Sequence, residues 1–406
     1  MNAVTFPESK LAMKTFRFSR FWAVLGMLLA VASVARADLA SIFTNVQKQA
    51  VIPRRTSIIF IQCHGLGYGD LSCYGQTNFQ TPNLDKLAAG GMRFNHYAPG
   101  DTNMAVAQAA LLLGKSPAND GINVAQALKN VGYRTALLGE WPLPGNPWQQ
   151  GFDDFLGYLN PEEGRNYFAD SFFRYNPNEY FNTASNLWMN WSPADGPNNG
   201  GQEEIYDNVD GKKGDYMPDF ILGGWLENFV RSYQPHRYNH FRPFFVFVNL
   251  TAPRSATPDR DDFPVPSDAP FSDEPWPQAA KNRAALITRL DGDIGRLFEQ
   301  LNKLGMTNNV AIFFTSSAAP EKFVDPRLNF FRTPADLQSE TNDVWTAPMI
   351  AYWPGHIPAG QVSDLNWSAR DILPTLTQIG FAQAPENIEG HSILPTLLGT
   401  ETGSPP

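Results

Sequence analysis

Continuous apolar runs divide the chain and predict strands that are buried on both faces. The clearest is TSIIFIQ at residues 56–62, which is rich in β-branched side chains and does not alternate with polar residues. Further runs predict strands at residues 134–138, 243–250, 309–316 and 347–353. Unbroken apolar strands of this kind are typical of a parallel sheet that is covered by helices.

Helical periodicity lies between these runs. From residue 287 to Gly305, apolar side chains recur at steps of three and four, which predicts an amphipathic helix that Gly305 ends. Shorter helices are predicted at residues 81–91, 124–131, 220–230 and 371–378. The alternation of strands and helices indicates an α/β fold with a mostly parallel central sheet flanked by helices.

Residues 101–117, DTNMAVAQAALLLGKSP, are interpreted as a loop that enters a helix. The apolar residues 109–113 form its buried face, Gly114 can end it, and Asp101 or Thr102 can cap its start. A helix N-terminus presents free N–H groups, so it attracts anions. The alternative is an ordinary helix packed on the sheet.

Two segments do not fit the periodic pattern. Residues 151–159, GFDDFLGYL, are interpreted as a compact turn region. Residues 160–215 are rich in Asn, Gly, Pro and aromatic residues and are interpreted as an insertion over the sheet. Its aromatic side chains could stack on sugar rings, but packing of the insertion onto the domain is favoured because aromatics bury so much area.

The N-terminus has the pattern of an export signal. Basic residues precede an apolar run, and Ala35-Arg36-Ala37 forms a cleavage site before Asp38, so residues 1–37 are predicted to be a signal peptide. The start is Met1 or Met13. The apolar run is short for a membrane span, so we expect residues 38–406 to be exported, to the periplasm or the medium, without an anchor.

Charge and cysteine content exclude some classes of protein. Loss of residues 1–37 removes five Lys/Arg and one Glu, which moves the net charge from −9 to −13. A chain this acidic is not expected to bind nucleic acid. Cys63 and Cys73 could form one disulfide in an exported chain, or they could be two buried thiols.

Several segments together resemble the sulfatase family of the alkaline-phosphatase-like superfamily. They are LGYGDLSCYG (66–75), TPNLDKLAAGGMRF (81–94), AALLLGK (109–115), GYRTALLGEW (132–141), GFDDFLGYL (151–159), NLTAP (249–253), ITRLDGDIGRLFEQLNKLG (287–305) and APMIAYWPGHIPAG (347–360). The resemblance implies an alkaline-phosphatase-like α/β fold. It also implies that the small C-terminal subdomain usual in the family is missing or abbreviated here.

The family's nucleophile does not carry over to this chain. In the family a cysteine or serine at the start of the helix is converted to formylglycine, and an arginine follows it. The alignment puts Met104 and Gln108 in these two positions, or Asn103 in the first if the count begins at Tyr97. None of these side chains can become formylglycine, and the nearest hydroxyl, Thr102, lies outside the motif.

The family's calcium ligands are also replaced. The aspartate pair after the first strand corresponds to His64 and Gly65, and the Asp-Asn pair after a later strand corresponds to Ser317 and Ala318. Calcium takes six to eight oxygen ligands, several of them anionic. The sequence therefore predicts neither a calcium site nor any other cofactor.

The residues that hold the sulfate in the family differ as well. Its Lys and His correspond to Glu140 and Pro142, a second His corresponds to Arg254, and the late Lys falls near Leu337. A glutamate facing the sulfate would repel it. Among these positions only Arg254 keeps a positive charge.

Two further groups of side chains are candidate metal sites. Cys63 and His64 with Asp70 could start a new metal site, although a third ligand beside the first two is not evident. His236 and His240 are four residues apart, but prolines on both sides favour a solvated loop.

These observations lead to two hypotheses of different class. The first is a catalytically inactive sulfatase homologue, exported, that binds a sulfated glycan or a protein partner or serves as an accessory to an active sulfatase. The alternative is a divergent sulfuric or phosphoric ester hydrolase with a site rebuilt around His64, Asp70, Thr102 and Arg254.

Overall fold

The computed structural model describes residues 55–100, 104–115, 121–169, 171–175, 202–205, 216–233, 242–317, 322–332 and 346–400. The predicted signal peptide, most of the insertion, and several candidate residues lie outside this description. The candidates are Thr102, Asn103, His236, His240, Ala318 and Leu337, together with the side chain of Met104.

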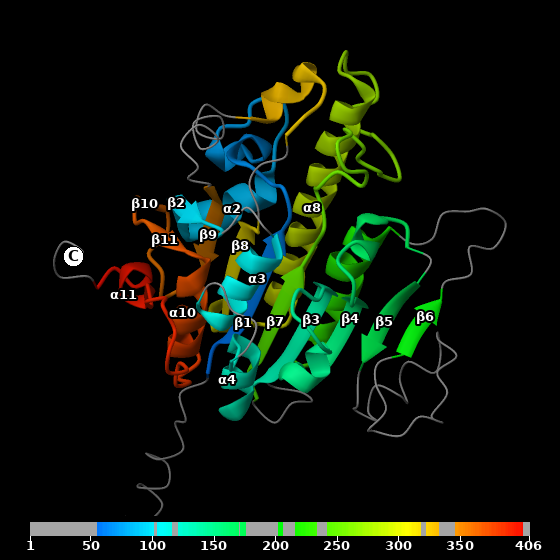
Figure 1. Ribbon diagram of the computed structural model, residues 1–406. Helices are drawn as coiled ribbons and strands as arrows, with labels where there is room; N and C mark the ends of the chain where they lie inside the picture. Colours follow the sequence, from blue (N-terminus) through cyan, green and yellow to red (C-terminus); the bar gives the residue numbers. More distant parts are fainter. Residues whose placement is uncertain are drawn as a thin grey trace, which may run out of the picture. The chain divides into compact units, whose positions relative to one another are not determined.

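One large mixed sheet organises the described part of the chain (Figure 1). The strand order is β10-β2-β9-β8-β1-β7-β3-β4-β5-β6, and β11 pairs with β2. The central strands are β1 (Ser57–Cys63), β3 (Arg134–Glu140), β4 (Asp154–Tyr158), β7 (Phe244–Asn249) and β8 (Val310–Ser316). They pair in parallel from β8 to β4, so the predicted α/β fold with a mostly parallel sheet is confirmed.

The outer strands are antiparallel to their inner neighbours or short. They are β2 (Met92–Ala98), β5 (Ser171–Tyr175), β6 (Gln202–Ile205), β9 (Ala347–Tyr352), β10 (Gln361–Ser363) and β11 (Trp367–Ser368). β9 runs antiparallel to β8 and to β2, and β5 runs antiparallel to β4 and to β6.

Helices cover both faces of the sheet (Figure 1). One layer contains α2 (Pro82–Gly90), α6 (Met217–Asp219), the π-helix η6 (Phe220–Leu226), α7 (Glu227–Ser232) and α8 (Gln278–Lys303). The other contains α3 (Met104–Leu113), α4 (Val124–Asn130), α10 (Ile372–Ile379) and α11 (Leu394–Leu397). No helix of the described residues is long and apolar enough to cross a membrane.

The side chains of β1 explain this double covering. Ile59, Ile61 and Cys63 pack in the core on the α8 side, and Ile58 and Phe60 pack in the core on the α3 side. Alternate residues of a strand point to opposite faces, so a strand that is apolar throughout needs a helix layer on each side.

Besides the short outer strands β5, β6, β10 and β11, two strands were not predicted from the sequence, β4 and β2. Residues 151–159 were interpreted as a turn region, but residues 154–158 form β4, a buried strand of the parallel sheet. A Cβ at Gly157 would lie 1.8 Å from the carbonyl oxygen of Gly139, so the glycine that weakened the strand pattern permits the close approach of β3 and β4. The other strand, β2, was not predicted, although its buried residues alternate with half-exposed polar ones such as Arg93 and Asn95, a pattern typical of a strand with one exposed face.

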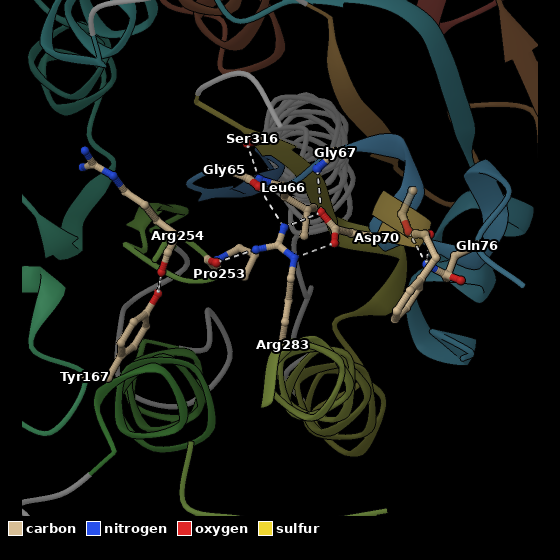
Figure 2. Close-up of polar contacts among 12 residues, drawn as sticks. Gly65, Leu66, Gly67, Asp70, Gln76, Tyr167, Pro253, Arg254, Arg283 and Ser316 are labelled. Carbon is tan, nitrogen blue, oxygen red and sulfur yellow. Dashed lines mark hydrogen bonds and ion pairs between the residues drawn. The ribbon is translucent and has the colours of Figure 1, made fainter. Parts of the chain in front are cut away.

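A buried ion pair fixes the loops at the carboxyl ends of β1 and β7. Arg283 of α8 donates from Nε and Nη2 to the two carboxylate oxygens of Asp70, at 3.0 and 2.7 Å (Figure 2). The same guanidinium donates to the carbonyl oxygens of Pro253 and Gly65, at 2.8 and 3.0 Å. Both side chains are 1% exposed. Three elements far apart in the sequence are thus joined at one point.

Replacement of Arg283 should test this role. We expect Arg283→Met to lower the free energy of unfolding by about 3–5 kcal/mol, because the Asp70 carboxylate would stay buried without its partner. Urea unfolding measures the loss. Arg327→Gln removes an exposed ion pair with Asp325 and should leave the unfolding midpoint unchanged. A loss from Arg283→Met as small as that of the control would contradict the role.

Candidate functional site

The carboxyl ends of the central parallel strands bring most of the predicted site positions to one edge of the sheet. His64 follows β1, Glu140 ends β3, and Ser317 follows β8. Arg254 lies in the loop after β7. Sites in α/β sheets are built at this edge, so the structure brings these predicted positions together where a site is expected.

His64 and Ser317 contact each other directly. Their Nδ1 and Oγ atoms are 2.8 Å apart, and both side chains are buried. The backbone N–H of Ser317 also donates to the carbonyl oxygen of Cys63, at 2.8 Å. Burial, and then the positive charge of Arg165, lower the pKa of His64 to about 3. A neutral imidazole and a neutral hydroxyl therefore lie between the ends of β1 and β8.

This arrangement does not fit a calcium ion. His64 and Ser317 supply one imidazole nitrogen and one hydroxyl, whereas calcium requires a set of oxygen ligands that includes carboxylates. Gly65 has no side chain, and its carbonyl oxygen accepts from Arg283. Ala318 lies outside the described residues.

The grouping of Cys63, His64 and Asp70 as a metal site is not supported. Within the described residues, no group of three His, Cys, Asp or Glu side chains could hold a metal ion. The carboxylate of Asp70 is occupied by Arg283 and by the backbone N–H of Gly67, at 2.8 Å. Burial, and then Asp70, raise the pKa of the Cys63 thiol well above its usual range. Cys63 and Cys73 are free thiols, so the disulfide considered from the sequence does not form.

The helix α3 begins at Met104, where the loop-to-helix pattern placed it. Four residues on, Gln108 is buried and donates from Nε2 to Oδ1 of Asn249, at 3.1 Å. Asn249 in turn donates from Nδ2 to the backbone carbonyl oxygen of Glu140, at 2.9 Å. The position of the family's arginine is thus part of an uncharged hydrogen-bond chain.

Gln62 belongs to the same polar layer. It pairs in register with Asn249 of β7 and with Thr315 of β8. The Oε1 atoms of Gln62 and Gln108 are buried and lack a hydrogen-bond partner within the described structure. Gln62 and Asn249 were not predicted to be site residues, although each is a polar residue at the end of an apolar strand.

Glu140 is buried beneath a turn at the start of the insertion. It is 1% exposed, and Thr251 Oγ1 donates to its Oε1 atom. A Cβ at Gly164 would lie 2.4 Å from Glu140 Oε1 and 2.6 Å from Thr251 Oγ1, so the turn η4 (Glu163–Arg165) lies directly on the carboxyl group. Burial raises the pKa of Glu140 to about 7, while Thr251 and then Arg165 act in the opposite direction.

Pro142, the other sulfate-binding position on this segment, is half-buried and supplies no donor. The neighbouring Trp141 donates from Nε1 to the carbonyl oxygen of Gly145, at 2.7 Å. This segment after β3 therefore forms a local turn.

Two arginines surround the site, and only one was predicted. The backbone carbonyl oxygen of Arg254 accepts from the Tyr167 hydroxyl, at 2.6 Å, and Figure 2 shows its side chain extending away from the Asp70–Arg283 pair. Arg165 was not predicted, because it lies in a segment without periodicity. It donates to the carbonyl oxygen of Ser255, at 2.9 Å, and its charge acts on both His64 and Glu140.

A pocket opens beside Glu140. We refer to it as the Glu140 pocket; its polar lining residues are Glu140, Tyr158, Tyr167, Asn249 and Thr251. Met217, Pro218 and Ile221 form its apolar side. No Lys, Arg or His is among the described lining residues. The pocket lacks the cations that would hold a sulfate group.

The Ser317–His64 pair has the spacing of a nucleophile and a general base, but its electrostatics are unsuitable. The charge that acts on His64 is the cation of Arg165, whereas a catalytic histidine is usually oriented by a hydrogen-bonding partner such as a carboxylate. A base with a pKa of about 3 is a weak proton acceptor at neutral pH. The pair can hold a proton, but it is not arranged to activate the serine.

The pKa of Glu140 predicts a dependence of stability on pH. Below about pH 4.5 Glu140 is protonated in both the folded and unfolded states, so the buried carboxyl imposes no penalty. Between about pH 4.5 and 7 the unfolded state loses the proton first, so stability falls as the pH rises, by up to about 3 kcal/mol. Urea unfolding of the wild type and of Glu140→Gln at pH 5 and pH 8 measures this change. The difference in unfolding free energy between the two proteins should shift by this amount between the two pH values.

Glu163→Gln is the matched control, because Glu163 is exposed and is not among the groups that act on the pKa of Glu140. The difference in unfolding free energy between this control and the wild type should be the same at both pH values. A difference for Glu140→Gln that is equally flat would contradict the raised pKa.

Comparison with known proteins gives the family. The Sulfatase family model matches residues 56–380. Arylsulfatase A of Homo sapiens is 27% identical over 377 residues, which cover 86% of this chain and 69% of that protein. N-acetylgalactosamine-6-sulfatase of Homo sapiens is 26% identical over 384 residues, which cover 85% of this chain and 66% of that protein.

The fold is similar to that of solved structures. The crystal structure of Ps i-CgsB matches with a TM-score of 0.65 and 25% identity, over 86% of this chain and 77% of that one. The family model spans most of the described sheet, from β1 through α10. This chain belongs to the sulfatase family.

Proposed function

We propose that this protein does not hydrolyse sulfate esters and that it acts outside the cytoplasm by binding a glycan. The observation that carries the proposal is the hydrogen bond between His64 and Ser317. By resemblance, these positions would carry calcium carboxylates in the family. A neutral pair in direct contact leaves neither the charge nor the ligands for the ion.

The two other requirements of sulfate-ester cleavage are also unmet. Glu140 takes the position of a sulfate-binding cation, and it is buried under Gly164 rather than open to a ligand. The alignment puts Met104, a thioether, in the nucleophile position at the start of α3. Loss of one essential nucleophile costs up to about a millionfold in other hydrolases, and here the surrounding binding groups are replaced too.

Glycan binding is favoured by the neighbours and by the pocket. Ps i-CgsB was crystallised in complex with k-i-k-neocarrahexaose and is 24% identical to this chain in that structure, with a TM-score of 0.64. The hydroxyls of Tyr158, Tyr167 and Thr251 line the Glu140 pocket. Those of Tyr167 and Thr251 donate to Arg254 and Glu140 in this structure, so a sugar would bind by exchanging these bonds for bonds to its own hydroxyls. A protein partner, such as an active sulfatase to which this chain is an accessory, is the other kind of ligand to be tested.

One observation favours the alternative, a divergent sulfuric or phosphoric ester hydrolase. A buried carboxyl with a pKa of about 7 at the carboxyl edge of the sheet could serve as a general acid or base. The rebuilt site predicted from the sequence included Asp70, but the carboxylate of Asp70 is paired with Arg283. The site would therefore use a different acid or base. In this alternative, Glu140 would replace Asp70 as the acid or base of the site.

An activity assay tests the proposal. We expect no sulfate release from 4-nitrophenyl sulfate or from k-i-k-neocarrahexaose, with or without calcium, and no calcium-dependent shift of the thermal midpoint. Arylsulfatase A assayed in parallel is the positive control for the aryl substrate. Turnover that Glu140→Gln or His64→Ala abolishes would refute the proposal and favour the hydrolase.

A binding experiment tests the ligand class. Because no basic side chain is among the described lining residues of the Glu140 pocket, desulfated k-i-k-neocarrahexaose should bind at least as tightly as the sulfated form. Isothermal titration calorimetry of both forms measures this. At least tenfold tighter binding of the sulfated form, lost in Arg254→Gln, would instead assign the ligand to a cationic surface around Arg254.

A further inference from the structure

The turn at residues 160–166 covers the Glu140 pocket with little apolar contact of its own. Gly164 is its buried residue, whereas Glu162, Glu163 and Asn166 are exposed. Its backbone closes through the N–H of Glu163 to the carbonyl oxygen of Asn160 and the N–H of Asn166 to that of Glu163, at 3.0 and 3.1 Å. Segments with few buried apolar contacts open at low cost in free energy.

Two side-chain bonds attach this turn to the loop after β7. Arg165 Nη1 donates to the carbonyl oxygen of Ser255, at 2.9 Å, and the Tyr167 hydroxyl donates to that of Arg254, at 2.6 Å. The Arg165 guanidinium is also paired with Glu162 of the same turn, at 2.8 Å. The turn is therefore held by a few polar contacts on one side and by its packing on Glu140 on the other.

The packing on Glu140 is close and specific. Gly164 has no side chain, and a Cβ there would overlap the Glu140 carboxyl and the Thr251 hydroxyl. With the turn closed, Glu140 is 1% exposed, and its carboxyl group accepts a hydrogen bond from the Thr251 hydroxyl. A neutral carboxyl can remain in this environment, whereas a carboxylate there lacks most of its hydration.

We propose that the turn at residues 160–166 is a lid on the Glu140 pocket, which is closed while Glu140 is protonated and opens when Glu140 ionises. Opening would expose the carboxylate to water and would give ligands access to Tyr158, Tyr167 and Thr251. The inference rests on the proposed binding function only for the ligand whose access the lid controls. Opening of the lid can itself be measured without a ligand.

The charged and titratable groups around Glu140 act in both directions. From the lid, Arg165 attracts the carboxylate and Glu162 repels it. From the sheet edge, Thr251 donates a hydrogen bond, and His64 is neutral. The hydroxyls of Tyr158 and Tyr167 line the same pocket, and the side of α6 and η6 presents Met217, Pro218 and Ile221, which carry no charge.

Burial outweighs the attractive groups, so ionisation favours the open lid. Burial is the largest cause that acts on the pKa of Glu140, and it raises that pKa from an ordinary value of 4.5 to about 7. The ratio of open to closed lid should therefore rise by up to about tenfold per pH unit between these values and level off above pH 7. An exported protein meets such changes in external pH.

Hydrogen–deuterium exchange with mass spectrometry tests the lid on the full chain. After correction for intrinsic exchange rates, peptides covering residues 160–169 should exchange at least tenfold faster relative to β1 peptides at about pH 8 than at about pH 5. Glu140→Gln cannot ionise at this position, so its lid should exchange slowly at both pH values. Glu163→Gln is the control variant, because Glu163 is an exposed residue of the same turn that does not act on the pKa of Glu140, and it should keep the pH response.

A second variant keeps the test valid if Glu140→Gln does not fold. Thr251→Val removes the hydrogen bond that lowers the pKa of Glu140, so the midpoint of lid opening should move to higher pH. A pH-independent lid in the wild type, or a response that Glu140→Gln retains, would overturn the inference. Either result would leave the sulfate-release experiment, and with it the proposed function, unaffected.

Discussion

The buried ion pair between Arg283 and Asp70 sets the backbone on which the rest of the site depends. A carboxylate that is 1% exposed cannot be left without a partner, so α8 and the loop after β1 are fixed relative to each other. The bond from Arg283 to the carbonyl oxygen of Pro253 adds the loop after β7 to the same unit. His64 precedes Gly65 in the first loop, and Thr251 lies two residues before Pro253 in the second. The positions of these side chains therefore follow from one guanidinium.

The scaffold and the chemistry of this family have separate physical requirements. The parallel strands β8 to β4 need only continuous apolar residues and two helix layers, and the chain supplies both. Sulfate-ester cleavage needs charges at the carboxyl edge, where the structure has the neutral pair of His64 and Ser317 and an amide chain through Gln108 and Asn249. Neutral groups are less costly to bury than charged ones, so the fold does not depend on charged residues at this edge.

The sequence predicted what local pattern determines and missed what tertiary packing determines. The strand at residues 56–62 was predicted because its centre, residues 58–61, is continuously apolar, whereas β4 was missed because Gly157 weakens a pattern that only the approach of β3 explains. The edge that holds the site was predicted from parallel strand ends. Arg165 and Arg283 were missed because neither is part of a motif, and their roles arise from contacts with residues about 90 and 213 positions away.

Glu140, Thr251 and Gly164 depend on one another, which argues that the covered pocket is more than the remnant of a lost site. A carboxyl at position 140 can be buried because Thr251 donates to it, and the turn packs closely on both side chains because Gly164 has no Cβ. Any other residue at position 164 would place a Cβ within 2.4 Å of the carboxyl oxygen. The combination closes the pocket around a group that titrates near neutral pH, so the covering is itself a feature of the present protein.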